Sequence, residues 1–220
     1  MKKQLLIAAL LMGTLLAGRS AVYYQGTAPV GGGTSMGALS STTIYDGNPA
    51  YVIGNSMTLS GLGSSLSGLT VTLNISGGNN SGLYAYLVHG GTTVTLMNQP
   101  GVGVNGFGAY GAGMNLTLQD AGAANGPIQS AISGSVLTGS YSAAGSLASF
   151  NNGDPNGLWT LYFADTIPGG GNATLNGWSL NITAVPEPVN VALGVFGGLL
   201  VVGGFVRNRV MAGKVFSFRK

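Results

Sequence analysis

The sequence predicts an all-β fold, an antiparallel sandwich or barrel, for the middle of this 220-residue chain. Hydrophobic and polar residues alternate in several short runs, which is the period of a half-buried strand. Gly, Asn and Pro separate these runs, and the chain holds 40 glycines, far more than a helical domain tolerates. Many short strands joined by tight turns are typical of sandwiches and barrels.

The N-terminus predicts a secretory signal peptide over residues 1–20. Lys2 and Lys3 precede an uncharged apolar run over residues 4–17, which is too short to span a bilayer. Small residues follow this run and suit cleavage. The chain contains no cysteine, so a lipoprotein is excluded, and the export machinery is the expected first partner.

Residues 21–57 are rich in Gly, Ser and Thr. We expect them to form an extended lead-in that holds the first one or two strands. Residues 69–75 place four apolar residues on one face, and residues 83–88 follow a Gly-Gly-Asn-Asn-Ser-Gly turn, so the two runs predict a hairpin. Further strands are expected at residues 93–96, 114–118, 159–163 and 178–182.

The C-terminus predicts a transmembrane helix. Residues 189–206 carry no charge and reach about 27 Å as a helix, enough for a hydrocarbon core. Arg207 and Arg209 follow at once and serve as a basic stop-transfer signal in a tail that ends at Lys220. Cations at both ends stay in the cytoplasm, so the part between them is expected to be exported.

The charge distribution argues against a nucleic-acid partner. All eight Lys and Arg residues lie near the two ends, and residues 20–206 contain none of them. The same interval holds all five acidic residues, a net charge of 0 − 5 = −5. Binding to a phosphate backbone requires clustered cations, which the middle of the chain lacks.

A short motif stands immediately before the apolar run. It consists of Val185, Pro186, Glu187 and Pro188. Together with the apolar run and the basic tail, residues 185–220 resemble the PEP-CTERM sorting signal of exopolysaccharide-producing Gram-negative bacteria. The resemblance implies that exosortase, a membrane enzyme, recognises the Pro-Glu-Pro motif and removes residues 189–206 as a transient anchor. It also implies a protein held in the inner membrane before processing and then placed at the cell surface or outside the cell.

A second resemblance covers residues 58–184. It depends on Asn156-Gly157-Leu158-Trp159-Thr160-Leu161, then Asp165, then Trp178-Ser179-Leu180. These residues resemble the end of the proprotein convertase P-domain, which is a β-sandwich jelly roll. The resemblance implies a jelly roll here, with Trp159 and Trp178 buried on neighbouring strands.

The residue inventory supplies no catalytic residue and no firm metal site. His89 is the only histidine, and we expect it in a solvent-facing turn. Thiol chemistry is excluded because the chain has no cysteine. A zinc site usually needs three or four Cys, His or carboxylate ligands close together, and one histidine with scattered aspartates does not supply them. Asp154 and Asp165 flank a strand of about 23 Å, whereas glycosidase carboxylates lie about 5–10 Å apart.

Four oxygen-bearing side chains are candidate calcium ligands, with calcium as the one candidate cofactor. They are Asn152, Asp154, Asn156 and Asp165. The first three stand at alternate positions, as in a calcium loop, but the twelfth position is Phe163, which cannot be the bidentate ligand. We favour the alternative in which residues 154–157 form a tight turn.

These observations predict a non-catalytic, exported protein of the cell surface or extracellular matrix, associated with extracellular polysaccharide. The alternative is a calcium-dependent carbohydrate-binding module, which requires exposed tyrosines. All nine tyrosines lie within residues 23–162 and keep that alternative open. An enzyme is disfavoured by the residue inventory.

Overall fold

The computed structural model describes residues 19–132, 134–185 and 188–215; of Arg19, residues 188–191 and residues 208–215 it describes the backbone alone. Residues 19–184 form one compact unit, and the C-terminal helix belongs to another. Of the predicted signal peptide, residues 1–18 lie outside the described residues.

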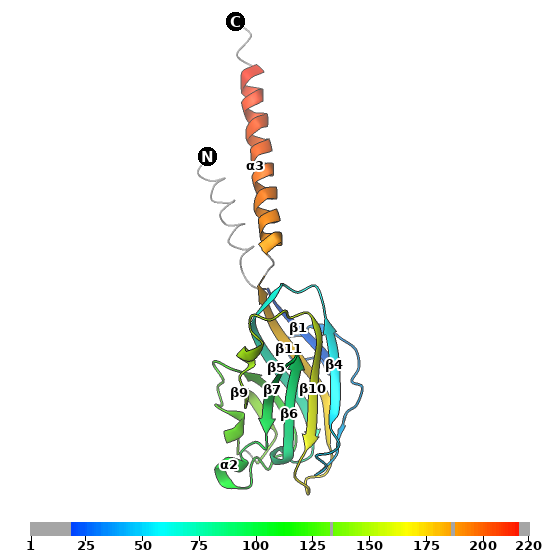
Figure 1. Ribbon diagram of the computed structural model, residues 1–220. Helices are drawn as coiled ribbons and strands as arrows, with labels where there is room; N and C mark the ends of the chain where they lie inside the picture. The colour runs from blue at the N-terminus through cyan, green and yellow to red at the C-terminus, as the bar shows by residue number, and fades with distance from the viewer. Residues whose placement is uncertain (1–18, 133, 186–187, 216–220) are drawn as a thin grey trace. The chain divides into compact units, whose positions relative to one another are not determined.

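The compact unit consists of two β-sheets and a few short helical turns (Figure 1). The all-β prediction is therefore confirmed. The larger, seven-stranded sheet has the order β2-β1-β11-β5-β8-β9, with β3 paired to β11. Its strands are β1 (Arg19–Gly26), β2 (Thr34–Ser35), β3 (Thr43–Ile44), β5 (Ser65–Gly77), β8 (Met114–Gln119), β9 (Leu137–Ser142) and β11 (Ala173–Val185).

The smaller sheet has four strands in the order β4-β10-β6-β7. They are β4 (Ile53–Leu59), β10 (Gly157–Asp165), β6 (Leu83–His89) and β7 (Thr92–Asn98). The short helical turns are η1 (Asn80–Gly82), α2 (Val102–Asn105), η2 (Ile128–Ser130) and η3 (Leu147–Phe150).

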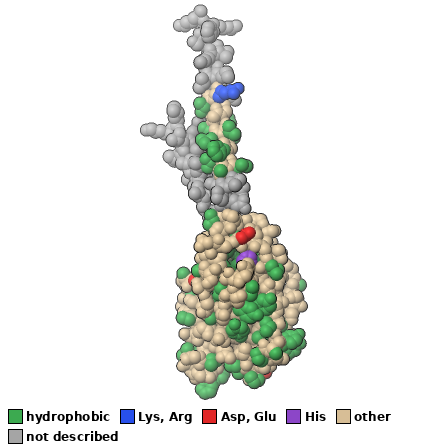
Figure 2. Space-filling model, viewed as in Figure 1, with side chains coloured by type: hydrophobic (Ala, Val, Ile, Leu, Met, Phe, Trp, Pro, Cys, Tyr) green, Lys and Arg blue, Asp and Glu red, His purple; other side chains and the backbone are tan. Residues whose placement is uncertain are grey.

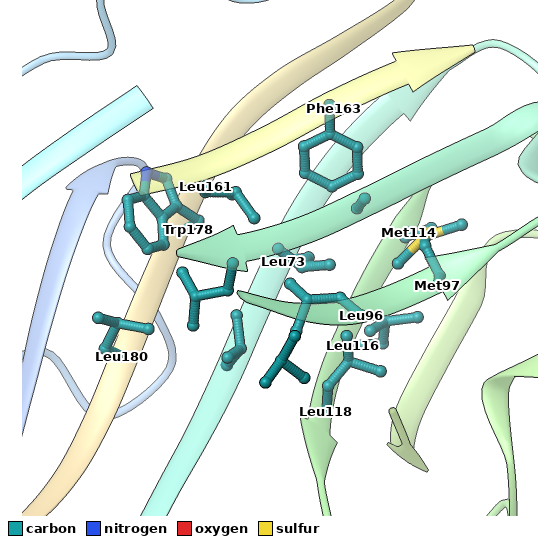
Figure 3. Packing of buried hydrophobic residues seen from close by; sticks show 14 of the residues in the cluster. Leu73, Leu96, Met97, Met114, Leu116, Leu118, Leu161, Phe163, Trp178 and Leu180 are labelled. Atoms are coloured by element: carbon teal, nitrogen blue, oxygen red, sulfur yellow. The ribbon is translucent and has the colours of Figure 1, made fainter. Parts of the chain in front are cut away.

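Alternate residues of both sheets point inward and form one hydrophobic core (Figure 3). Leu161 and Phe163 of β10 enter it from the smaller sheet, and Leu73 and Leu180 enter it from the larger sheet; all four are buried. Burying a side chain of this size contributes about 1.5–3 kcal/mol to stability. The alternation in the sequence is thus explained by one dry face on each sheet.

Both tryptophans are buried, as predicted, with 0% of Trp159 and 2% of Trp178 exposed. They do not lie on neighbouring strands, because Trp159 belongs to β10 of the smaller sheet and Trp178 to β11 of the larger sheet. Each indole nitrogen has a partner. Trp159 Nε1 donates to the carbonyl oxygen of Pro155 (2.9 Å), and Trp178 Nε1 donates to Gln25 Oε1 (3.2 Å).

The predicted hairpin of residues 69–75 and 83–88 is wrong. These runs are β5 and β6, and they belong to different sheets. Gly77 and Gly78 have φ of 72° and 68°, a conformation that favours glycine, and η1 follows them. The chain therefore crosses from one sheet to the other here, and the true hairpin is β6–β7, joined at Gly90 and Gly91.

The prediction of a purely antiparallel fold is also wrong for two pairs. Strands β8 and β9 pair in parallel over six positions, from Met114 with Leu137 to Gln119 with Ser142. The short strand β2 pairs in parallel with β1. A parallel pair needs a crossover connection, and the long segment between β8 and β9, which contains η2, provides it.

The predicted lead-in, residues 21–57, contains most of β1, all of β2 and β3, and the start of β4. Strand β1 pairs antiparallel with β11 along its whole length, from Arg19 with Ala184 to Gly26 with Gly177. The first strand is therefore part of the larger sheet, beside β11, which with β5 is one of its two 13-residue strands.

The C-terminal helix α3 spans Pro188–Val215 and includes the predicted apolar span. Within the described part of the chain, no helix is long and apolar enough to cross a membrane. The transmembrane helix stays a prediction.

Candidate functional site

Three tyrosines form a row on the outer face of the smaller sheet; we call Tyr84, Tyr86 and Tyr162 the tyrosine row. Tyr84 and Tyr86 are two residues apart on β6, so they point to the same side of the sheet. Tyr162 of β10 is the direct cross-strand partner of Tyr86. The three side chains are half-buried, whereas the residues next to them along the strands point inward and are buried in the core.

The rings of the row contact one another. The Tyr86 and Tyr162 rings are stacked, with centroids 4.8 Å apart and planes 17° apart. The Tyr84 ring lies 5.7 Å from that of Tyr86 at an angle of 49°. Such aromatic pairs contribute about 0.5–1.5 kcal/mol beyond their buried area, so the rings hold one another in place.

A glycine makes room for the end of the row. Gly54 of β4 is the cross-strand partner of Tyr162. A Cβ atom at this position would lie 3.1 Å from Cε1 of the Tyr162 ring, which is tighter than ordinary contact. The absent side chain lets the Tyr162 ring settle beside β4.

Hydroxyl groups and one leucine surround the row. The hydroxyls of Ser56 and Thr160 are hydrogen-bonded at 2.8 Å on the same outer face. Leu158, on β10, exposes 57% of its surface. Figure 2 shows hydrophobic side chains gathered over the middle of the face of the smaller sheet that is turned to the viewer. The face is thus an apolar strip with polar, uncharged borders.

The row is electrically neutral. Burial raises the pKa of the Tyr86 phenol above its ordinary value of 10.0, and the phenols of Tyr162 and Tyr84 raise it further. Tyr86 therefore keeps its proton at physiological pH. Since residues 20–206 contain no Lys or Arg, the strands that carry the row offer no lysine or arginine that could attract an anionic ligand to the face.

Three of the predicted calcium ligands lie in the segment before β10. Asp154 Oδ1 accepts hydrogen bonds from the backbone nitrogen and the side-chain amide of Asn156 (2.9 and 2.6 Å), and these bonds lower the pKa of Asp154. Asn156 Oδ1 accepts from the Leu62 backbone nitrogen (2.9 Å). Asn152 is exposed, with φ of 66°. The backbone turn lies just before Asp154, at residues 151–152, and not over the predicted residues 154–157.

The fourth predicted ligand, Asp165, lies at the other end of β10, nine residues long. The structure does not bring it to the 152–156 segment. Its side chain is fully buried, Oδ1 accepts from the Ile167 backbone nitrogen (3.0 Å), and Oδ2 has no partner among the described residues. Burial raises the pKa of Asp165. Across the described residues, no three His, Cys, Asp or Glu side chains are grouped as a metal site.

His89 is not a solvent-facing turn residue. It is the last residue of β6 and is half-buried. Its ring is stacked on that of Trp159, with centroids 3.8 Å apart and planes 3° apart. Nδ1 lies 2.9 Å from the carbonyl oxygen of Leu158, and Nε2 lies 2.7 Å from that of Asp154. His89 therefore ties the β6–β7 hairpin to the segment before β10.

The sorting motif falls at the edge of the described residues. Val185 ends β11 and is exposed, whereas Pro186 and Glu187 lie outside the described residues. Pro188 begins α3, and Arg207 and Arg209 lie within that helix.

Sequence reasoning missed the tyrosine row. The spacing of Tyr84 and Tyr86 in an alternating run gives a signal, because residues two apart on a strand share a face. Tyr162 gives none, since its place beside Tyr86 depends on the register of β6 with β10.

No family model matches this chain, and no curated protein matches it. Among solved structures, the chain is similar to the Aeromonas sobria serine protease in complex with its chaperone ORF2 (12% identity, TM-score 0.44), covering 80% of this chain and 29% of that one. The same protease without the chaperone gives 13% identity and a TM-score of 0.43, over 76% and 27% of the two chains. FLHE gives 11% identity and a TM-score of 0.39, over 77% and 98%. The chain thus spans under a third of the length of the protease chains.

Proposed function

We propose that this chain is an exported, non-catalytic protein of the cell surface or extracellular matrix that associates with neutral extracellular polysaccharide. The neutral tyrosine row on the outer face of the smaller sheet carries this proposal. Sugar rings present apolar C–H faces and hydroxyl edges, and binding sites of this kind combine aromatic surfaces with a few placed polar groups. The row and its hydroxyl borders supply both.

The charge of the unit narrows the class of polysaccharide. An acidic glycan or a nucleic acid requires a counter-charge, and the interval 20–206 has no Lys or Arg. A neutral glycan requires none. Because the row contains no metal ligand, binding through it proceeds in chelator, whereas the alternative function, a calcium-dependent carbohydrate-binding module, requires the metal.

The export and sorting part of the proposal is supported by the order of features in the sequence. A cationic and apolar N-terminus, the Val-Pro-Glu-Pro motif at 185–188, the uncharged run at 189–206 and the basic tail follow one another as in a PEP-CTERM protein. In this proposal residues 189–206 act as a transient inner-membrane anchor that exosortase removes, and the protein then resides at the cell surface or outside the cell.

Retention on a neutral polysaccharide tests the binding function. The full-length chain, kept in solution by a sugar-free zwitterionic detergent, is passed over insoluble β-glucan in chelator. We expect retention, and we expect the Tyr86→Ser/Tyr162→Ser variant to lose most of it. Tyr110→Ser is the matched control, because Tyr110 is an exposed tyrosine outside the row. Equal retention of both variants, or retention that needs calcium, would contradict the proposal.

A C-terminal epitope tag tests the sorting function. The mature protein should lose the tag in the native host. A variant with Pro186, Glu187 and Pro188 all changed to Ala should keep it in the inner membrane. If both forms keep the tag equally, exosortase does not process this chain.

A further inference from the structure

A hollow lies on the outer face of the larger sheet, on the opposite side of the core from the tyrosine row. It has a volume of about 520 Å³, within the range of about 300–1,000 Å³ that is usual for ligand sites. Its floor comes from β5, β8, β9 and β11, and residues 27–30, which follow β1, form one wall. We call it the amide groove.

The side chains on the floor are hydroxyls and amides in register across the strands. Asn74 of β5 is paired with Asn115 of β8, and Thr72 with Thr117. Thr117 is in turn paired with Ser140 of β9. All five point outward, because their sequence neighbours enter the core. No residue of the lining carries a formal charge; Gln119, Ser179 and Thr27 complete its polar side chains.

Hydrogen bonds hold part of this set and leave the rest available. The hydroxyls of Thr72 and Thr117 lie 3.0 Å apart, and Asn176 Nδ2 donates to Asn74 Oδ1 (3.1 Å). The Asn74 amide nitrogen and the whole Asn115 amide have no partner among the described residues. A ligand therefore meets hydroxyls that are already held by hydrogen bonds and amide groups that are still free to pair with it, and ordering the Asn115 side chain is part of the cost of binding.

We propose that the amide groove is a second binding site for a neutral polysaccharide chain, and that this unit is bivalent. An amide presents a donor and an acceptor side by side, which matches the vicinal hydroxyls of a sugar ring. The uncharged lining gives no attraction to an ion. The inference extends the proposed function, because it assigns the same ligand class to the opposite face. Two occupied faces would cross-link two glycan chains.

The test separates binding from cross-linking. Full-length protein in sugar-free detergent is run on native gels that contain galactomannan or dextran, and the viscosity of galactomannan is measured with increasing protein. The wild type should be retarded and should raise the viscosity. The Asn74→Ala/Asn115→Ala variant should still be retarded, with about tenfold weaker affinity, and should no longer raise the viscosity. Asn48→Ala, an exposed asparagine in the loop between β3 and β4 and away from both faces' named residues, is the matched control.

The outcomes distinguish the two faces. Unchanged affinity and viscosity in the groove variant overturn the inference and leave the proposed function standing. If the groove variant is no longer retarded at all while Tyr86→Ser/Tyr162→Ser is retarded like the wild type, the tyrosine row is not a binding site and the groove is. No retardation of the wild type by either glycan overturns the inference, and retention on β-glucan then decides the proposed function separately. If the double variant does not fold, Asn115→Ala at an exposed position carries the same test.

Discussion

The two sheets are alike on their inner faces and different on their outer faces. Inward, both place Leu, Ile, Val, Met and aromatic side chains in one core. Outward, the smaller sheet carries the tyrosine row, whereas the larger sheet carries the amide groove. The core constrains the inner positions to be apolar, but it leaves the outer positions free. The two outer faces therefore differ in what they present, stacked aromatic rings on one and hydroxyl and amide groups on the other.

Truncating the core under each face should have the largest effect. Trp159→Ala lies under the smaller sheet and Trp178→Ala under the larger one, and each should lower the free energy of unfolding by about 3–5 kcal/mol. Because one core joins the sheets, both variants should unfold in a single transition in urea. Two separate transitions would show that the sheets are independent.

Filling the space beside Tyr162 should have the next largest effect. Gly54→Val places branched carbons where even a Cβ would lie 3.1 Å from the ring, so the ring must move or β4 must shift. Overpacking of this kind costs about 1–3 kcal/mol. Near-UV circular dichroism should report the loss of the Tyr86–Tyr162 stack. Gly103→Val is the control, because Gly103 is exposed, its φ is not in the left-handed region, and nothing lies within 4 Å of its Cβ position.

Single substitutions within the row should rank its members. Tyr86 contacts both of the other rings, so Tyr86→Ser should weaken β-glucan binding most, by about tenfold or about 1.4 kcal/mol. Tyr84→Ser and Tyr162→Ser should weaken it less. Tyr86→Phe keeps the ring and should bind almost normally. Equal binding by Tyr86→Ser and the wild type would show that the tyrosine row does not bind the glycan.

A change of pH should have the smallest effect, on stability and not on binding. Neither face carries a formal charge, so glycan retention should be constant between pH 4 and pH 7. Burial raises the pKa of Asp165 above its ordinary value of 3.8. The protonated form is therefore favoured in the folded state, and its contribution is full below pH 3.8 and is lost as pH rises through the raised pKa.

Asp165→Asn should remove this decline in the urea midpoint. Asp46 changes stability with pH in the opposite direction, because hydrogen bonds from the backbone of Gly169 and Gly170 lower its pKa. Its contribution is present above pH 3.8 and is lost as pH falls through the lowered value. A midpoint that rises from pH 4 to pH 7 in the wild type and equally in Asp165→Asn would contradict the assignment to Asp165.

The sequence predicted the strands better than it predicted their partners. Alternation over residues 69–75 and 83–88 identifies two strands with one buried face each, but it does not say to which sheet a strand belongs. The glycines and η1 between them redirect the chain across the core, and a pattern of hydrophobicity cannot show that. The buried tryptophans were predictable from their position in alternating runs, whereas their placement in opposite sheets was not.

The same limit applies to both sites. The polar positions of β5 and β8, such as Asn74 and Asn115, are visible as the outward half of an alternating run. Their meeting depends on a pairing between strands about 40 residues apart in sequence, which only the fold determines. The candidate calcium residues show the converse, because proximity in sequence placed Asp154 and Asn156 in a segment that uses their oxygens internally.

Strand β11 has a mechanical consequence. It is 13 residues long and is hydrogen-bonded on one side to β1 and on the other to β5. The ladder bonds run across the strand, so a pull on its C-terminal end along the strand axis loads many of them together in shear. Peeling the strand away would break the same bonds one at a time under a smaller force. A pull on Ala184 along the strand axis therefore loads β11 in shear, which takes more force to unfold than peeling does.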